Sequence, residues 1–257
     1  MDAEIKEAAT SDGDESGRFL VGREEIEARH YDPPALFRRG GEGMKLLDLF
    51  CGAGGCSVGY NRAGFEVVGV DIKPQKNYPF EFHCADAFAF LEKHGREFDV
   101  IHASPPCQVF CKLKNMHNAK THTDLLTPMR NGLQALGKPY IIENVEGAPM
   151  HRYIVLCGTM FGLGTEQAEL RRHRRFEISP YIAPVEPCRH GRKSRVIGVY
   201  GGHGRDRRRT VNTQDFSTDE RRDAMGIDWM NGQELSQAIP PAYTEWIGQR
   251  LMEALAP

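Results

Sequence analysis

Short apolar segments alternate with helix-like segments between residues 45 and 143, and this alternation restricts the fold more than any other feature. Four segments have the apolar character of buried strands, namely 45–50, 66–71, 98–103 and 139–143. The segments 56–63, 85–93 and 124–136 between them have a helical pattern. Nearly continuous apolar strands joined by helical crossovers predict a doubly wound α/β core, with a mostly parallel sheet covered on both faces.

The pattern is weaker after Leu163. Residues 195–200 are compatible with a strand, and residues 217–225 and 234–255 with helices, the second broken at Pro240 and Pro241. Residues 1–43 are acidic and are expected to form a disordered N-terminal extension. Met44 directly precedes the first strand, so we expect it to be the functional start. A chain beginning at Met44 that failed to fold would contradict this expectation.

Charge is distributed unevenly along the chain. The formal net charge of −2 gives no overall attraction to a polyanion, so any nucleic-acid surface has to be a local cluster. Such a cluster is present, although it could also be an ordinary solvated segment. It consists of Arg171, Arg172, Arg174, Arg175, Arg189, Arg192, Lys193, Arg195, Arg205, Arg207, Arg208 and Arg209.

The seven cysteines form no paired framework, and the sequence has no signal peptide or long apolar run. We therefore expect free thiols, a cytoplasmic location and no membrane partner. Cys188, His190 and His203 could supply half of a metal site. Because no CxxC pair completes it, the sequence predicts no metal.

A glycine-rich turn follows the first predicted strand in the segment DLFCGAGG, residues 48–55. Glycines let the backbone approach a ligand closely, and the next helix offers free N–H groups. Asp71 ends the following strand, where a carboxylate can bind ribose hydroxyls, and Asp86 lies where a third strand should end. Although a glycine-rich turn is often only structural, these positions together predict a nucleoside cofactor. No GKS or GKT ending is present, so the turn is not a P-loop.

Two further residues end predicted strands at the same edge of the sheet. Cys107 lies in SPPCQ, residues 104–108, on a loop stiffened by two prolines, and a thiolate there is a strong nucleophile. Glu143 begins ENV, residues 143–145. Taken alone, Cys107 would more often be a small buried hydrophobe and Glu143 a capping or paired acid.

Together these motifs resemble the cytosine-C5 DNA methyltransferase family across nearly all of residues 45–255. The resemblance also includes LCGTMFG at 156–162, RRHRRF at 171–176 and IPPAY at 239–243. It implies a methyltransferase of the S-adenosylmethionine-dependent, Rossmann-like type. It divides the chain into a catalytic and cofactor-binding core (44–176), a short basic target recognition segment (177–216) and C-terminal helices that pack back on the core (217–257).

The resemblance also implies a mechanism. Cys107 attacks C6 of a cytosine swung out of the duplex, Glu143 hydrogen-bonds N3 and the exocyclic amine, and C5 accepts the methyl group. Arg172 and Arg174 bind the flipped base or its phosphate. The residues expected to bind S-adenosylmethionine are Asp48, Phe50, Gly52, Gly54, Asp71, Asp86 and Pro105. Those expected to contact nucleic acid are Gln108, Arg205, Arg207 and Arg208.

Three features depart from the family pattern. Leu170 and Gln237 occupy positions where the family usually has Gln and Asn, and the recognition segment is short for a folded lobe. We therefore expect a short or relaxed recognition sequence, with affinity that comes mainly from phosphate contacts and falls steeply with salt. A strict site of six or more base pairs would contradict this expectation.

Several alternatives remain open. The chain could be a tRNA cytosine-C5 methyltransferase, a non-catalytic DNA-binding regulator with the same fold, or an enzyme that uses another one-carbon donor. The principal expectation is a monomer that acts on double-stranded DNA in a bacterial or phage-infected cell. A separate restriction endonuclease could accompany it.

Overall fold

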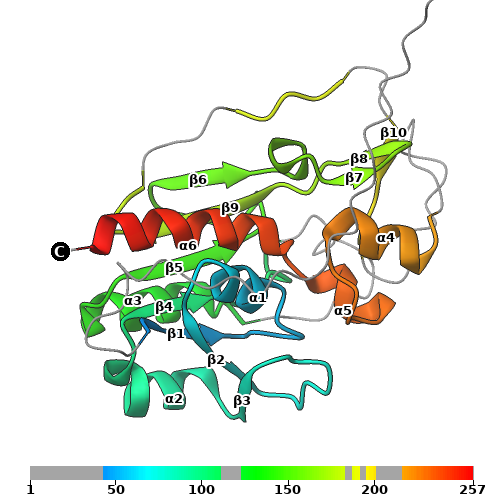
Figure 1. Ribbon diagram of the computed structural model, residues 1–257. Coiled ribbons are helices and arrows are strands. Elements are labelled where there is room, and N and C mark those ends of the chain that lie inside the picture. Colours follow the sequence, from blue (N-terminus) through cyan, green and yellow to red (C-terminus); the bar gives the residue numbers. More distant parts are fainter. Residues whose placement is uncertain (1–42, 111–122, 183–186, 192–194, 201–215, 257) are drawn as a thin grey trace, which may run out of the picture. The chain divides into compact units, whose positions relative to one another are not determined.

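The computed structural model describes residues 43–110, 123–182, 187–191, 195–200 and 216–256 (Figure 1). The expectations for residues 1–42, including most of the N-terminal extension, lie outside the described residues. So do those for Arg205, Arg207 and Arg208. Within the described part, no helix is both long and apolar enough to cross a membrane.

A seven-stranded sheet with the order β3-β2-β1-β4-β5-β9-β6 forms the core. Neighbouring strands from β3 to β5 pair in parallel, and β9 pairs antiparallel with both β5 and β6. The predicted doubly wound, mostly parallel sheet is therefore confirmed. The strands are β1 (Lys45–Leu49), β2 (Glu66–Asp71), β3 (Glu81–Cys84), β4 (Val100–Ala103), β5 (Tyr140–Asn144), β6 (Tyr153–Leu156) and β9 (Arg174–Ser179).

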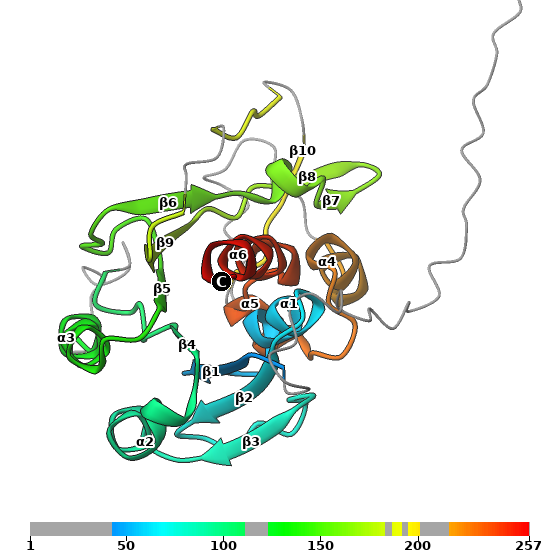
Figure 2. The same cartoon turned by 60° about the vertical axis from the view of Figure 1, so that its left-hand side comes forward.

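Helices cover both faces of this sheet (Figure 2). On one face α1 (Gly55–Arg62) and α6 (Pro241–Leu255) pack together, and on the other lie α2 (Ala87–His94) and α3 (Leu126–Leu136). The contact between α1 and α6 requires Gly59, because a Cβ there would lie 2.1 Å from Thr244 Oγ1. The Thr244 hydroxyl in turn donates to the Cys56 carbonyl at 2.9 Å.

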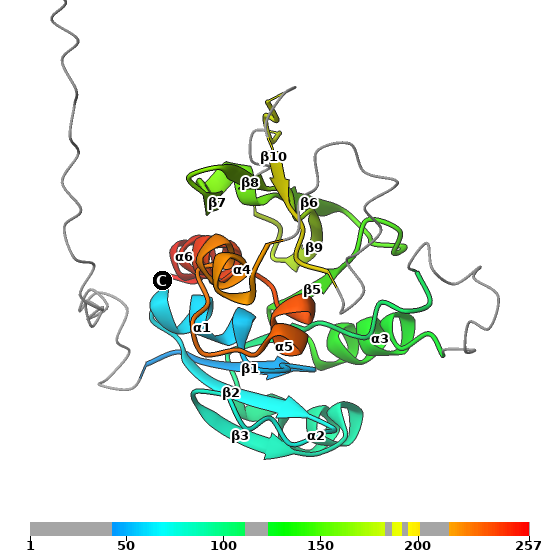
Figure 3. The same ribbon diagram turned by 90° about the vertical axis from the view of Figure 1, so that its right-hand side faces the viewer.

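A second, three-stranded sheet has the order β10-β8-β7, with β7 at Gly164–Thr165, β8 at Ala168–Leu170 and β10 at Arg195–Ile197. It packs with α4 (Thr218–Met225) and α5 (Gly232–Gln237) around a separate apolar cluster (Figure 3). The short helices η2 (Gly95–Glu97) and η4 (Gly158–Phe161) complete the described elements.

Two elements cross the predicted domain boundaries. β9 continues past residue 176 to Ser179 in the main sheet. Among the C-terminal helices, α6 packs against α1, whereas α4 contacts β7 and β8. The recognition segment contributes β10 to a small unit that also uses residues before it and after it. Tertiary packing of distant short segments therefore supplies an apolar cluster that residues 177–216 alone are too few to form.

Candidate active site

The predicted motifs meet at the carboxyl ends of four adjacent strands, β2, β1, β4 and β5. Leu49 near the end of β1 pairs with Val70 of β2 and with Ala103 of β4. Ala103 pairs with Ile142, one residue before Glu143. This alignment places the glycine-rich turn, Asp71, the SPPCQ loop and Glu143 along one edge of the sheet. Ligands of open α/β sheets bind at this edge.

The glycine-rich turn is held against the end of β2. The Gly52 N–H donates to Asp71 Oδ2 at 3.1 Å, and Gly52 has a φ of 51°. A Cβ at Gly52 would meet nothing within 4 Å, so open space lies beside this backbone. Gly54, with φ of 85°, is crowded instead, because a Cβ there would lie 2.9 Å from Pro79 and 3.0 Å from Tyr78. The two glycines therefore differ, Gly52 leaving room beside the turn and Gly54 permitting close packing.

Asp48, which is predicted to touch the cofactor, lies buried below the glycine-rich turn. Its side chain is fully buried, and Oδ2 accepts a hydrogen bond of 2.5 Å from Ser57 in α1. Burial raises the pKa of Asp48 to about 7, despite the opposing effect of the Ser57 hydroxyl. This hydrogen bond links β1 to α1 below the turn. Asp48 Oδ1 is buried and has no hydrogen-bond partner within the described part of the chain, and the contact with the cofactor stays a prediction.

Phe50, Ile72 and Asp86 surround the end of β2. Phe50 is half-buried and contacts Phe88 edge-to-face, with ring centroids 6.3 Å apart. Asp86 is exposed and caps α2, since Oδ1 accepts hydrogen bonds from the N–H groups of Phe88 and Ala89. Ile72, directly after Asp71, is 64% exposed and offers apolar surface beside this strand end. No sequence motif marks Ile72, and only its exposure in the fold brings it to notice.

The SPPCQ loop is fixed at several points. The Ser104 N–H donates to the Leu49 carbonyl at 3.1 Å, and the Asn144 side chain donates to the Pro105 carbonyl at 2.9 Å. Pro105 is buried, Cys107 is partly exposed, and Gln108 is exposed. Asn144 immediately follows Glu143, so this bond ties the predicted acid strand to the loop of the predicted nucleophile.

Glu143 lies in a buried ion pair. Arg174 Nε is 3.0 Å from Glu143 Oε1, and the Glu143 residue is 7% exposed. Burial raises the pKa of Glu143, although Arg174 and a hydrogen bond from Ser104 oppose this shift. Such a carboxyl group is more readily protonated near neutral pH than an exposed glutamate.

Arg172 is not placed like Arg174. It is 1% exposed, and its two terminal nitrogens donate to the backbone carbonyls of Val199 and Ser236. Burial, and then the charge of Arg174, lower the pKa of Arg172. In this structure Arg172 therefore links the segment after β10 to the end of α5, and its contact with a base or phosphate stays a prediction.

A buried hydrogen-bonded chain behind Glu143 was not anticipated from the sequence. Tyr60 Oη lies 2.9 Å from His102 Nδ1, and His102 Nε2 lies 2.9 Å from Ser104 Oγ. Ser104 in turn hydrogen-bonds Glu143. Burial lowers the pKa of His102 to about 3, so the ring is neutral and donates through one nitrogen while accepting through the other. His102 lies in the buried apolar strand β4, and no local sequence pattern distinguishes it from an ordinary core residue.

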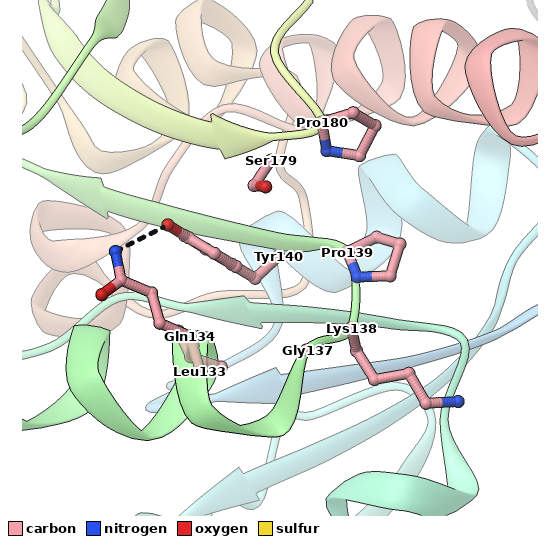
Figure 4. A pocket seen from close by; sticks show the side chains of 8 residues that line it. All are labelled: Leu133, Gln134, Gly137, Lys138, Pro139, Tyr140, Ser179 and Pro180. Carbon is pink, nitrogen blue, oxygen red and sulfur yellow. Dashed lines mark hydrogen bonds between the residues drawn. The ribbon is translucent and has the colours of Figure 1, made fainter.

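A surface hollow lies at the amino end of β5, the end opposite to Glu143 (Figure 4). Its lining includes Gln134, whose side-chain amide donates to Tyr140 Oη at 3.4 Å. Tyr140 begins β5, so the hollow is at the amino end of this parallel strand, away from the aligned motifs. We assign it no part in the site.

The sheet order, with an antiparallel strand between β5 and β6, and the glycine-rich turn beside two acidic strand ends define a Rossmann-like methyltransferase fold. The crystal structure of S. pombe Dnmt2 methyltransferase has this fold, with a TM-score of 0.56 at 13% identity. That similarity covers 82% of this chain and 99% of the other.

Sequence comparison relates part of the chain to known methyltransferases. Residues 44–154 match the family described as C-5 cytosine-specific DNA methylase. The chain is 29% identical over 133 residues to type II methyltransferase M.HgiDI of Herpetosiphon aurantiacus, covering 46% of this chain and 42% of the relative. It is 29% identical over 121 residues to type II methyltransferase M.AgeI of Thalassovita gelatinovora, covering 40% and 28%. The matched segment thus spans less than half the length of either relative.

Proposed function

We propose that this protein is a DNA (cytosine-5)-methyltransferase that uses S-adenosylmethionine and acts through a covalent bond from Cys107 to C6 of a flipped-out cytosine. The observation that carries the proposal is the hydrogen bond of 2.9 Å from Asn144 to the Pro105 carbonyl. It joins the loop that bears Cys107 to the strand that bears Glu143. This hydrogen bond suits a mechanism in which the nucleophile and the acid contact the same cytosine ring, Cys107 at C6 and Glu143 at N3.

The chemistry follows from the needs of the cytosine ring. The Cys107 thiolate forms a bond to C6, and the electron pair of the C5–C6 double bond makes C5 nucleophilic. C5 then forms a bond to the methyl carbon, and the electron pair of the broken sulfur–carbon bond stays on the donor's sulfur. Loss of the C5 proton to a base returns electrons to the C5–C6 bond and expels the Cys107 thiolate.

Glu143 supplies the second point of contact. A protonated carboxyl group donates to N3 and accepts from the exocyclic amine, and the proton at N3 stabilises the ring during attack. The raised pKa of Glu143 keeps a larger fraction of this group protonated near neutral pH. Arg174, 3.0 Å from Oε1, holds the carboxyl group in place and stabilises its ionised form after the proton is given up.

The residues around the glycine-rich turn fit a nucleoside cofactor. The space beside Gly52 admits the methionine portion, and Asp71 is placed for the ribose hydroxyls at the end of β2. Phe50 and the exposed Ile72 offer apolar surface to the adenine ring, and Asp86 is exposed for its amine. When bound, S-adenosylmethionine supplies an electrophilic methyl group.

A Glu143→Gln variant is expected to lower kcat by about 10²–10⁴-fold with little change in KM. The amide keeps the donor and acceptor geometry toward the base but has no proton to transfer. In the wild type, the protonated fraction of Glu143 falls as pH rises through its raised pKa, so kcat should decline on that side. The pH dependence of kcat for wild type and variant measures both effects.

Glu146→Gln is the matched control, because Glu146 is an exposed acid three residues further along the chain. Its kcat and pH profile should equal those of the wild type. If Glu143→Gln kept the same alkaline decline as the wild type, Glu143 would not be the group responsible.

The substrate is tested by methyl transfer from tritiated S-adenosylmethionine to duplex DNA and to tRNA in parallel. We expect label in the duplex DNA. Label confined to tRNA would show that the protein is a tRNA cytosine-C5 methyltransferase instead. Label in neither substrate would favour a non-catalytic regulator. The two relatives named above are called type II methyltransferases. By analogy, we propose a separate restriction endonuclease as a partner.

A further inference from the structure

We propose that Cys157, His173, Cys188 and His190 form a structural zinc site that fastens the recognition segment to the core. Each of these residues offers one ligand atom, and all four atoms lie within 4.8 Å of one another. The sequence predicted no metal, because only Cys188 and His190 were visible as neighbours. The fold supplies the two missing ligands from positions 31 and 15 residues before Cys188.

The distances fit a tetrahedral ion. Cys157 Sγ lies 3.3 Å from His190 Nε2, and His173 Nε2 lies 3.2 Å from Cys188 Sγ. Zinc bonds of about 2.3 Å to sulfur and about 2.0–2.1 Å to nitrogen place tetrahedral ligand atoms roughly 3.3–3.8 Å apart. The rings of His173 and His190 are steeply inclined to each other, with an interplanar angle of 67°. Both rings present Nε2 to the cluster, so an ion between the four atoms would contact both imidazoles.

The ligands come from three separate segments. Cys157 directly follows β6, His173 lies between β8 and β9, and Cys188 and His190 belong to the described segment 187–191 before β10. Because segments 187–191 and 195–200 are short and belong to the recognition segment, a shared ion would anchor them to the core. A four-ligand site of this kind leaves no open coordination position, which indicates a structural ion.

Neighbouring groups support the cluster. Thr159 Oγ1 donates to Cys157 Sγ at 3.4 Å, which stabilises the thiolate form. Arg171 donates to the Gly191 carbonyl at 2.6 Å and thereby holds the residue after His190. Two thiolates and a divalent cation have no net charge together. The bound ion would therefore add no net positive charge beside Arg172, Arg174 and Arg189, which adjoin the ligands in the sequence. The mixed thiolate and imidazole set selects Zn²⁺ over hard cations such as Mg²⁺ and Ca²⁺.

The site has a consequence for the residues beside it. His173 lies between Arg172, which is buried against backbone carbonyls, and Arg174, which pairs with Glu143. An ion bound to His173 would fix the backbone that carries both arginines. Loss of the ion should therefore loosen the small sheet and the loop between β8 and β9.

The test uses the full chain, produced in zinc-supplemented medium and purified under reducing conditions without chelators. Mass spectrometric metal analysis should find about one zinc per chain, and Cys188→Ser and His190→Gln should reduce this to near zero. Replacement by Co²⁺ should give the ligand-field bands of a tetrahedral site and a thiolate-to-cobalt charge-transfer band. The Thr159→Val variant should bind zinc about 10–100-fold more weakly.

Cys84→Ser and His83→Gln are matched controls, because Cys84 and His83 are exposed in β3 and lie outside the cluster. Both should retain the metal. Absence of zinc from the wild type after addition of Zn²⁺, or of the tetrahedral cobalt spectrum, would overturn the proposal even if the ligand variants fail to fold. A disulfide between Cys157 and Cys188 in protein purified under reducing conditions would also overturn the zinc proposal.

Discussion

Replacing Cys107 with Ala is expected to abolish methyl transfer to duplex DNA, with a loss on the order of 10⁴-fold or more in kcat. Without the thiolate no bond forms to C6, and C5 remains too weak a nucleophile to accept the methyl group. Cys107 is partly exposed on a loop held by Ser104 and Asn144, so truncation of its side chain should leave the fold intact. Transfer of tritium from S-adenosylmethionine into DNA measures the loss.

Cys84→Ser is the control for general effects of removing a thiol, because Cys84 is an exposed cysteine of β3 and a serine can keep the hydrogen bond from its side chain to the Ile72 carbonyl. It should retain full activity, and both variants should keep the wild-type Tm. Duplex DNA that carries 5-fluorocytosine should trap a covalent complex with the wild type and with Cys84→Ser but not with Cys107→Ala, because fluorine at C5 cannot leave as a proton does. Label entering DNA from Cys107→Ala would refute the assigned nucleophile.

The Glu177→Ala substitution is expected to lower the free energy of unfolding by about 3–5 kcal/mol. Glu177 accepts hydrogen bonds from Arg130 Nε at 2.9 Å and from the His151 N–H at 2.8 Å. The side chains of Arg130 and Glu177 are each 5% exposed, so the variant leaves a buried guanidinium without its counter-charge. The pair joins α3 to β9, and its loss weakens the attachment of the antiparallel strand. Urea denaturation followed by circular dichroism measures the change.

Glu253→Ala provides the comparison, because Glu253 forms an exposed ion pair with Arg250 at 3.1 Å. Its side chain is 60% exposed, so the same substitution should cost less than about 1 kcal/mol. The double substitution Arg130→Met and Glu177→Leu should recover much of the lost stability, since it removes both buried charges. Equal effects of Glu177→Ala and Glu253→Ala would show that burial does not determine the strength of the Arg130 pair.

The core strands could be predicted because a strand buried on both faces requires a nearly continuous run of apolar residues. The predicted strand 66–71 coincides with β2, and the other predicted core strands differ from β1, β4 and β5 by one or two residues at their ends. No range was predicted for β3, β6 or β9, although a strand was expected to end near Asp86, which lies just after β3. β3 is mostly exposed at the sheet edge, and β9 begins with two arginines and joins the sheet antiparallel, so neither carries the local pattern of a buried parallel strand. β6 is a four-residue strand at the other edge of the sheet.

The candidate site divides in the same way. The positions of Cys107, Glu143 and Asp71 at one edge of the sheet were predictable, because each lies at or just after the end of a recognisable strand and parallel strands bring their carboxyl ends to one edge. The burial of Asp48 and Arg172 was not predictable, because the motifs do not encode it. The pairing of Arg174 with Glu143 depended on the register between β9 and β5, where Glu143 lies opposite Phe176.

Local periodicity and motif order are therefore enough to predict the doubly wound core, the edge at which the site lies and the residue types placed there. The three-dimensional packing is needed to see which arginine pairs with Glu143, which acid is buried, and that Cys157 and His173 lie beside Cys188 and His190. Those contacts join residues far apart in the chain. Their formation depends on antiparallel pairing and on the packing of short segments, neither of which leaves a periodic signal in the sequence.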